Sequence, residues 1–341
     1  MIGNNLCADV QNIKMEEKEI MKFKTAISLL LSMVLLGFTV FTVPAFAEDT
    51  FDMNDYSIED LQYMTPEEKI KLISDYVNTY NPLGIKDTYN SNEVKYSSML
   101  ESDVNPVWKS SNDNDDEFAT HQLMTLQAFL CSVNDCGFYD TDGTTALGIS
   151  LTLAAASGLP DKEADQIASG FVGHFYNPDT QKNWAGSKKN TAKTNCQMHF
   201  TNAITRLQQN THPDLNGEDF QYVLIELGKA LHYVQDASEP HHSNNKLAGS
   251  SSHTQFETFA NENISKYIDD LSHCTAYYYN VAGYNDADGV AHEAAVISKP
   301  YYQYVSSLTD RSTWDYGALH TTQNAVGFSA GLIYRLFSIR T

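Results

Sequence analysis

The sequence predicts an all-α fold, a single compact domain in which many helices pack around a common core. Apolar residues recur at intervals of three and four along several stretches after residue 108, which is the spacing of a helix with one buried face. Alternation of apolar and polar residues between turn signals, the pattern of a strand, is scarce. The chain has 341 residues, of which 42% are hydrophobic, and is therefore long enough to bury a sizeable core.

The first 47 residues are expected to be a leader and no part of that fold. The apolar run 27–47 follows Lys22 and Lys24 and ends in Ala45-Phe46-Ala47. A basic start, an apolar middle and a small-residue exit are typical of a secretory signal peptide, whereas a membrane anchor is the alternative, because about 20 apolar residues can span a bilayer. We expect 1–20 to be a mis-called start, 21–47 to be the signal peptide, and the protein to be secreted, with no integral membrane span after cleavage.

Residues 48–107 contain one plausible helix, Thr65 to Tyr76, with Pro66 in its first turn, where proline is well tolerated. The stretch 78–92 that follows is rich in Asn, Pro and Gly. The sequence therefore predicts a mostly irregular segment over 48–107. It is either a pro-segment that is removed after export or a permanent N-terminal tail.

Residues 108–341 are expected to form the helical domain, in which the periodicity marks three helices clearly. The first of these helices, which includes Phe220 and Val234, should end at Glu239-Pro240, because the residue before a proline disfavours the helical conformation. The apolar positions of the three helices are Phe220, Leu224, Leu227, Leu231 and Val234; Phe256, Phe259, Ala260, Tyr267 and Leu271; and Ala325, Phe328, Leu332, Leu336 and Phe337.

Composition restricts the partners of this chain. With 43 acidic against 22 basic side chains, the formal net charge is −21, which argues against nucleic acid, because phosphate binding depends on clustered Lys and Arg. Eleven histidines among so many carboxylates suit polyvalent cations instead.

Four cysteines follow the leader, namely Cys131, Cys136, Cys196 and Cys274. An even number in an exported protein permits two disulfides. Three pairings are possible, and Cys131 and Cys136 are the closest in sequence. Free buried thiols are the alternative.

The spacing of histidine and acidic residues indicates a metal site. His232 and Asp236 are four residues apart near the end of a predicted helix, so their side chains share one face. His253 and Glu257 repeat this spacing at the start of the next helix, and His242 lies on the loop between the two pairs. Imidazole nitrogens and carboxylate oxygens are ligands for zinc, so this set predicts a zinc site.

These residues resemble the signature of the bacterial zinc-dependent phospholipases C, including the alpha-toxin type. The segment GHFYNPDT at 173–180, centred on His174, is similar to another motif of that family. Trp108, followed thirteen residues later by His121, is similar to the mature amino terminus and first helix of its members. The resemblance covers nearly all of 108–341. It implies an all-α fold with three zinc ions in one cleft.

The resemblance also implies the ligands of each zinc ion. For Asp161 the sequence leaves Asp165 open as a rival, since both precede His174 at a suitable distance. One zinc would be held by Trp108, through its freed amino group and carbonyl, with His121 and Asp236; a second by Asp161, His174 and His232, with Asp236 bridging; and a third by His242, His253 and Glu257.

The activity implied is that of a zinc-dependent phospholipase C that acts as a monomer on phospholipid at a membrane surface or in micelles. Metal-activated water, oriented by Asp161 as general base, would attack phosphorus and release diacylglycerol and a phosphorylated head group. Phe171 would line the substrate site. Lys162 stands where choline-preferring members carry a tyrosine, so a choline preference is not predicted. The amino group of Trp108 requires cleavage after Val107.

Two other functions remain open. One is a zinc-dependent single-strand nuclease or phosphodiesterase of the same fold. Those nucleases place the first histidine about five residues after the tryptophan and have an aspartate where Glu257 stands, and the acidic charge also disfavours them. The other is a secreted zinc- or lipid-binding protein without catalytic turnover.

Overall fold

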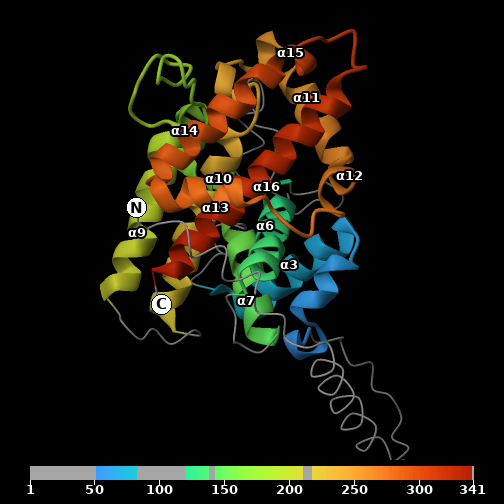
Figure 1. The fold of residues 1–341 in the computed structure, drawn as a ribbon, viewed down its shortest axis with the longest axis vertical. Helices are drawn as coiled ribbons and strands as arrows, with labels where there is room; N and C mark the ends of the chain where they lie inside the picture. Colours follow the sequence, from blue (N-terminus) through green and yellow to red (C-terminus); the bar gives the residue numbers. More distant parts are fainter. Residues whose placement is uncertain (1–50, 83–119, 138–142, 210–216, 340–341) are drawn as a thin grey trace, which may run out of the picture. The chain divides into compact units, whose positions relative to one another are not determined.

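The computed structural model describes residues 51–82, 120–137, 143–209 and 217–339, which are helical apart from turns, loops and one isolated β-bridge, Asn177 to Lys182 (Figure 1). The predicted all-α fold is confirmed over these residues. Within the same ranges no helix is both long enough and apolar enough to cross a bilayer. The expected signal peptide over 21–47, the mis-called start over 1–20 and Trp108 lie outside the described residues.

Most of the chain described is in α-helices, joined by short 3₁₀ turns that are introduced below where they matter. The α-helices are α3 (Pro66–Tyr80), α6 (Thr120–Cys136), α7 (Gly143–Ser157), α8 (Ala164–Ala168), α9 (Ala192–Gln209), α10 (Glu218–Ala237), α11 (His253–Glu262), α12 (Ile264–Ile268), α13 (Ala276–Tyr284), α14 (Ala287–Ser298), α15 (Tyr302–Val305) and α16 (Trp314–Ser338).

Helix α10 packs against α7, α9, α14 and α16, and it therefore has neighbours on several sides. All five apolar positions predicted for it are buried, at 3% exposure or less. Gly228 lets α10 approach α7 closely: a Cβ there would lie 2.5 Å from Cβ of Ala156 and 2.7 Å from the carbonyl oxygen of Leu153. This close contact sets the position of the C-terminal half of α10, which carries His232 and Asp236.

The second predicted helix is divided in two. The periodic stretch 256–271 forms α11 and then α12, and the break lies at Asn263. The Asn263 side-chain amide donates to the carbonyl oxygen of Phe259 at 2.8 Å, an interaction that competes with the helical backbone bonds. The apolar periodicity continues through the break, so this pattern does not indicate that the helix is divided.

The segment 51–82 is more ordered than the sequence predicted. It contains the 3₁₀ turns η1 (Met53–Asp55) and η2 (Ile58–Gln62) before α3. Helix α3 begins at Pro66, one residue after the predicted start at Thr65, and continues four residues beyond the predicted end at Tyr76. Thr65 and Glu68 form a capping box at its start. The expectation of a mostly irregular 48–107 is therefore wrong for this part, whereas 83–107 lies outside the described residues.

Helix α7 explains why this segment folds. Its sequence, GTTALGISLTLAAAS, is apolar around the whole circumference, so every side needs a cover. Helices α6 and α10 cover two sides, and α3 with η1 and η2 covers another. The Tyr76 hydroxyl lies 2.9 Å from the Thr152 hydroxyl in this buried contact.

Candidate metal centre

Eight side chains that the sequence singled out as possible zinc ligands meet in one buried place. Each is at most 6% exposed, although they come from six elements that lie far apart in the chain. The contributors are His121 of α6, Asp161 of η4 (Pro160–Lys162), His174 of η5 (Val172–His174), His232 and Asp236 of α10, His242 of η6 (His242–Asn244), and His253 and Glu257 of α11.

Asp236 lies at the centre of this cluster. Its Oδ2 atom is 2.8 Å from Nδ1 of His174 and 3.1 Å from Nε2 of His232. Its Oδ1 atom is 3.1 Å from Nδ1 of His242 and 3.7 Å from Nε2 of His121. The carboxylate thus faces four imidazoles, two with each oxygen.

Asp161, and not Asp165, joins the cluster. The Oδ1 atom of Asp161 lies 3.6 Å from Nδ1 of His174 and 3.6 Å from Nε2 of His232. Asp165 is exposed on α8 and is absent from the groups of close ligand atoms. The sequence could not separate the two, because both lie on the same short stretch before His174.

A further group surrounds Glu257. Its Oε1 atom is 2.9 Å from Nε2 of His253, one turn away on α11, and 3.5 Å from Nε2 of His242. Glu239 belongs to the same group of mutually close ligand atoms. Glu239 is not among the ligands predicted from the sequence, in which it marks only the end of a helix. The one local signal was its place three residues before His242.

The ring orientations suit metal ligation. The side-chain N–H of Gln235 donates to the Thr125 hydroxyl, so its amide oxygen faces Nδ1 of His121 at 2.7 Å and accepts a hydrogen bond from it. Nδ1 of His232 likewise donates to the carbonyl oxygen of Ser157 at 2.8 Å. In both rings the Nε2 atom is left to face the carboxylates, which is the tautomer that a zinc ligand needs.

The histidine and carboxylate groups of the cluster shift one another's pKa values strongly. Burial alone would lower the pKa of His232 and His242, but the neighbouring carboxylates outweigh it and raise both to about 9; Asp236 acts on both rings and Asp161 on His232. Burial would raise the pKa of Asp236, yet the three nearest imidazoles hold it well below its usual range. His121 has its pKa lowered by burial and by His232. Without a cation, the cluster is held together by imidazolium–carboxylate pairs.

The polar atoms of the cluster are spaced as the ligands of a metal would be. Neither oxygen of Asp236 and neither ring nitrogen of His242 has a hydrogen-bond partner among the described residues, although nitrogen and oxygen atoms face one another at 2.8–3.7 Å. Two ligand atoms on one tetrahedral zinc lie about 3.3 Å apart. Unsatisfied buried polar atoms are costly, and a cation between them would remove that cost. The residues present therefore fit zinc.

The remaining histidines lie outside the cluster wherever the structure describes them. His241 contacts Glu239 at 2.8 Å and Ser252 at 3.0 Å, so it is His242 that faces Asp236. His199 pairs with the buried carboxylate of Glu226 at 3.0 Å. Neither histidine is among the zinc ligands that the resemblance implies.

Phe171 lies beside the cluster. Its ring centre is 5.4 Å from that of His174, edge to face, and its side chain is buried. Its φ of 55° is left-handed, a conformation that a bulky residue adopts only where the surroundings enforce it.

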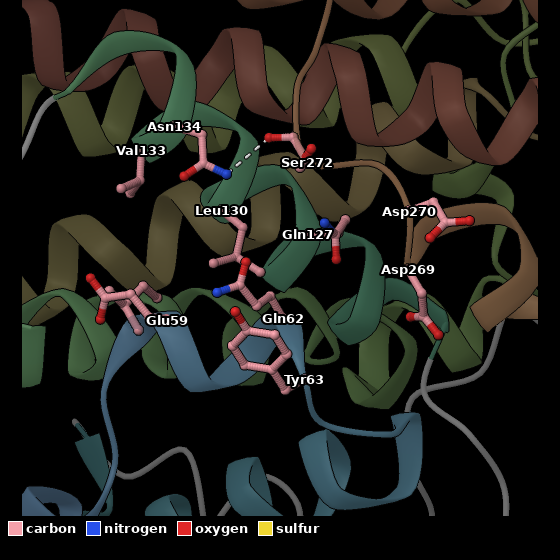
Figure 2. A pocket seen from close by; sticks show the side chains of 11 residues that line it. Glu59, Gln62, Tyr63, Gln127, Leu130, Val133, Asn134, Asp269, Asp270 and Ser272 are labelled. Carbon is pink, nitrogen blue, oxygen red and sulfur yellow. Dashed lines mark hydrogen bonds between the residues drawn. The ribbon is translucent and has the colours of Figure 1, made fainter. Parts of the chain in front are cut away.

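A separate pocket of about 280 Å³ lies where η2 meets α6 and the chain after α12. Figure 2 shows Glu59 and Tyr63 on one side, Asn134 on another, and Asp269 and Asp270 on a third. None of the eight side chains of the metal cluster lines it.

The chain is similar to known proteins in sequence and in fold. Residues 151–316 match the family model described as zinc dependent phospholipase C. A phospholipase C of Clostridium perfringens is 29% identical over 186 residues, which are 51% of this chain and 46% of that protein. A phospholipase C of Listeria monocytogenes is 27% identical over 144 residues, which are 41% of this chain and 46% of that protein. The solved alpha toxin from Clostridium absonum shares the fold, with a TM-score of 0.57 and 22% identity over 69% of this chain and 67% of that one.

The matched residues include most of the cluster. The chain spans about half the length of the curated relatives, 46% in each of these two comparisons. Seven of the eight clustered side chains, all except His121, lie within 151–316. Residues 151–316 therefore match the zinc-dependent phospholipase C family, and the helical fold is shared with the solved alpha toxin.

Proposed function

We propose that this protein is a secreted phospholipase C that cleaves the glycerol-side phosphodiester of phospholipids, giving diacylglycerol and a phosphorylated head group. One observation carries the proposal: eight buried imidazole and carboxylate side chains from six elements converge around Asp236. The family model for zinc dependent phospholipase C matches residues 151–316, which contain seven of the eight. We further propose that the protein acts as a monomer.

Three zinc ions would be held by the three groups of ligands. His121 and Asp236 would hold one together with Trp108, which lies outside the described residues; Asp161, His174 and His232 would hold the second, with Asp236 as the bridge; and His242, His253 and Glu257 would hold the third. Bound zinc lowers the pKa of water towards 7 and compensates the negative charge that builds on a phosphate.

Within this site Asp161 is the proposed general base. At 6% exposure it is the most accessible of the clustered carboxylates, since Asp236 is 1% and Glu257 is 0% exposed. A base has to reach the proton that it removes, and this accessibility supports the role. Phe171, packed against His174, is proposed to line the lipid side of the site.

The proposed maturation follows from the part assigned to Trp108. Its amino group can bind metal only if the chain is cut after Val107, so 21–47 would act as the signal peptide and 48–107 as a pro-segment ahead of the catalytic domain 108–341. Sequencing the amino terminus of the secreted protein tests this, and a start at Trp108 is the expected result.

Metal removal tests the activity. Dialysis against a chelator is expected to abolish hydrolysis of phosphatidylcholine and phosphatidylglycerol vesicles, and added Zn²⁺ is expected to restore it, with diacylglycerol as the lipid product. Activity that persists in metal-free protein would contradict the proposal. The same preparation is assayed on single-stranded DNA. Cleavage of DNA but not lipid would identify a nuclease, and full zinc content with no hydrolysis of either would identify a non-catalytic binding protein.

A further inference from the structure

The segment 271–274, which links α12 to α13, runs along the surface of α6. The carbonyl oxygen of Leu271 accepts from the Gln127 amide at 2.7 Å and from the Cys131 thiol at 3.1 Å. The Asn134 amide donates to the carbonyl oxygen of Ser272 at 3.0 Å, the bond that is dashed in Figure 2. Successive turns of α6 therefore bind successive residues of this segment.

The contacts continue to the end of the segment. One carboxylate oxygen of Asp135 accepts the backbone N–H of Cys274 at 2.8 Å and the hydroxyl of Tyr279 at 2.6 Å. The other is 2.7 Å from Nδ1 of His273. Asp135 stands one turn after Cys131, on the same face of α6, so Cys274 lies over the face that carries Cys131.

The Cys274 thiol faces the Cys131 thiol. Its interaction with Cys131, together with burial, raises the pKa of Cys131. Cys131 is fully buried and Cys274 is half-buried, so a soluble oxidant reaches Cys274 first. The four cysteines among the described residues are all thiols.

Geometry excludes most other pairings. Cys136 is five residues after Cys131 on one helix, which rotates it by about 140° from Cys131, so these two thiols cannot join within α6. Cys196 is buried on α9, which packs against α10 and α14 and not against α6 to any comparable extent. One cross-link is expected, where the sequence permitted two.

We propose that Cys131 and Cys274 form a disulfide that fastens α6 to the segment between α12 and α13. The proposal rests on the export proposed above and not on the proposed catalysis. A cross-link between these positions closes a loop that contains Asp161, His174, His232, Asp236, His242, His253 and Glu257. It would hold the elements carrying the metal site together when zinc is absent.

The chemistry needs an external disulfide such as oxidised glutathione. The Cys274 thiolate attacks it, forming a mixed disulfide and releasing one reduced glutathione. The Cys131 thiolate then attacks the Cys274 sulfur and releases the second. Two protein thiols are oxidised, one glutathione disulfide is reduced, and the protein loses two hydrogen atoms.

The test maps cysteine linkage in the folded, zinc-loaded protein after incubation with oxidised glutathione, using alkylation of the remaining thiols in denaturant, digestion and mass spectrometry. The expected result is one linked pair of peptides containing Cys131 and Cys274, which dithiothreitol separates. Cys131→Ser and Cys274→Ser should each lose the link, whereas the matched control Cys136→Ser should keep it. In the chelated wild type, reduction should lower the thermal midpoint.

Two results would overturn the proposal: a link from Cys274 to Cys136, or alkylation of both Cys131 and Cys274 in oxidised protein whose circular dichroism shows an intact helical fold. Because linkage mapping uses no substrate, an inactive protein that forms the link leaves this inference standing and removes only the phospholipase proposal.

Discussion

Asp236 is the side chain on which most of the metal cluster depends. Each of its oxygens faces two imidazoles, so one buried carboxylate serves ligands from α6, η5, α10 and η6. Its negative charge stabilises the protonated rings of His232 and His242 in the metal-free protein. The same charge would stabilise a divalent cation in their place. The cluster can therefore hold either protons on these two rings or a divalent cation, and the protons compete with the cation for the same nitrogen atoms.

Removing a single histidine ligand should remove metal and activity together. His232→Ala and His253→Ala are each expected to lose at least one zinc ion and to reduce phospholipase activity by at least about 100-fold, because substitutions that act only on the support of a metal ligand already cost 10- to 100-fold. Zinc is counted by elemental analysis and activity by diacylglycerol release.

The control for these two variants is His320→Ala. His320 stacks on Tyr301 and Tyr316, outside the metal cluster, so its removal should leave the zinc content and the activity near the wild-type values. Wild-type turnover in His232→Ala or His253→Ala would show that the assignment of ligands is wrong.

Zinc binding should release protons. With pKa values raised to about 9, His232 and His242 are both protonated in metal-free protein at about pH 7.5, yet a metal ligand must be neutral imidazole. Titration calorimetry in two buffers of different ionisation enthalpy should show about two protons released per chain. A binding heat that does not depend on the buffer would contradict this prediction.

The same shifts predict how pH affects the metal-free protein. Because these pKa values are raised above the usual 6.5, their stabilising contribution is complete below about pH 6.5 and is lost as pH rises through about 9. Urea unfolding in the presence of chelator should show lower stability at about pH 9 than at about pH 6.5. Zinc affinity should be higher at about pH 9 than at about pH 6.5, because more of the ligand rings are then neutral.

The contact between α7 and α10 positions two parts of the site. Helix α10 carries His232 and Asp236, and the end of α7 supplies the Ser157 carbonyl that orients His232. The chain then enters η4, where Asp161 lies. The spacing between these two helices therefore determines whether Asp161 and His232 meet.

Gly228→Ala should disturb that spacing. The added Cβ would collide with Ala156 and with the Leu153 backbone, so we expect a loss of about 1–3 kcal/mol in the free energy of unfolding and weaker zinc binding. Gly283→Ala on α13 is the control, because a Cβ there has no neighbour within 4 Å, and removing a helical glycine should stabilise by up to about 1 kcal/mol. Equal stability of the two variants in urea unfolding would contradict this account.

The N-terminal segment 51–82 is packed into the hydrophobic core of the domain. Leu61, Leu72 and Ile73 are buried in that core. Lys69 is also buried, with its ammonium 3.5 Å from Asp269, and burial lowers its pKa. If the chain is cut after Val107 as proposed, these contacts should keep the segment bound to α7, whose apolar face would otherwise be exposed.

Leu72→Ala tests this packing. Since Leu72 is 3% exposed, its truncation should lower the stability of the whole protein by about 2–5 kcal/mol. Lys71→Ala is the control from the same helix: its side chain is 76% exposed, so the change should be within about 0.5 kcal/mol. A melting temperature unaffected by Leu72→Ala would show that the segment contributes nothing to the fold.

The features that the sequence determined by itself are local. Helix content, the two histidine–carboxylate pairs one turn apart and the start of α3 at Pro66 all follow from short spacings, since helical geometry relates residues three and four apart. The break at Asn263 was hidden, because its apolar neighbours keep the same period on both sides.

Only the tertiary structure decided which distant segments meet. It placed Asp161 rather than Asp165 beside His174 and His232, and it brought Glu239 into the group around Glu257. It also covered α7 with α3 and laid Cys274 against Cys131. Such choices depend on the packing of surfaces far apart in the chain, and residue spacing carries no information about them.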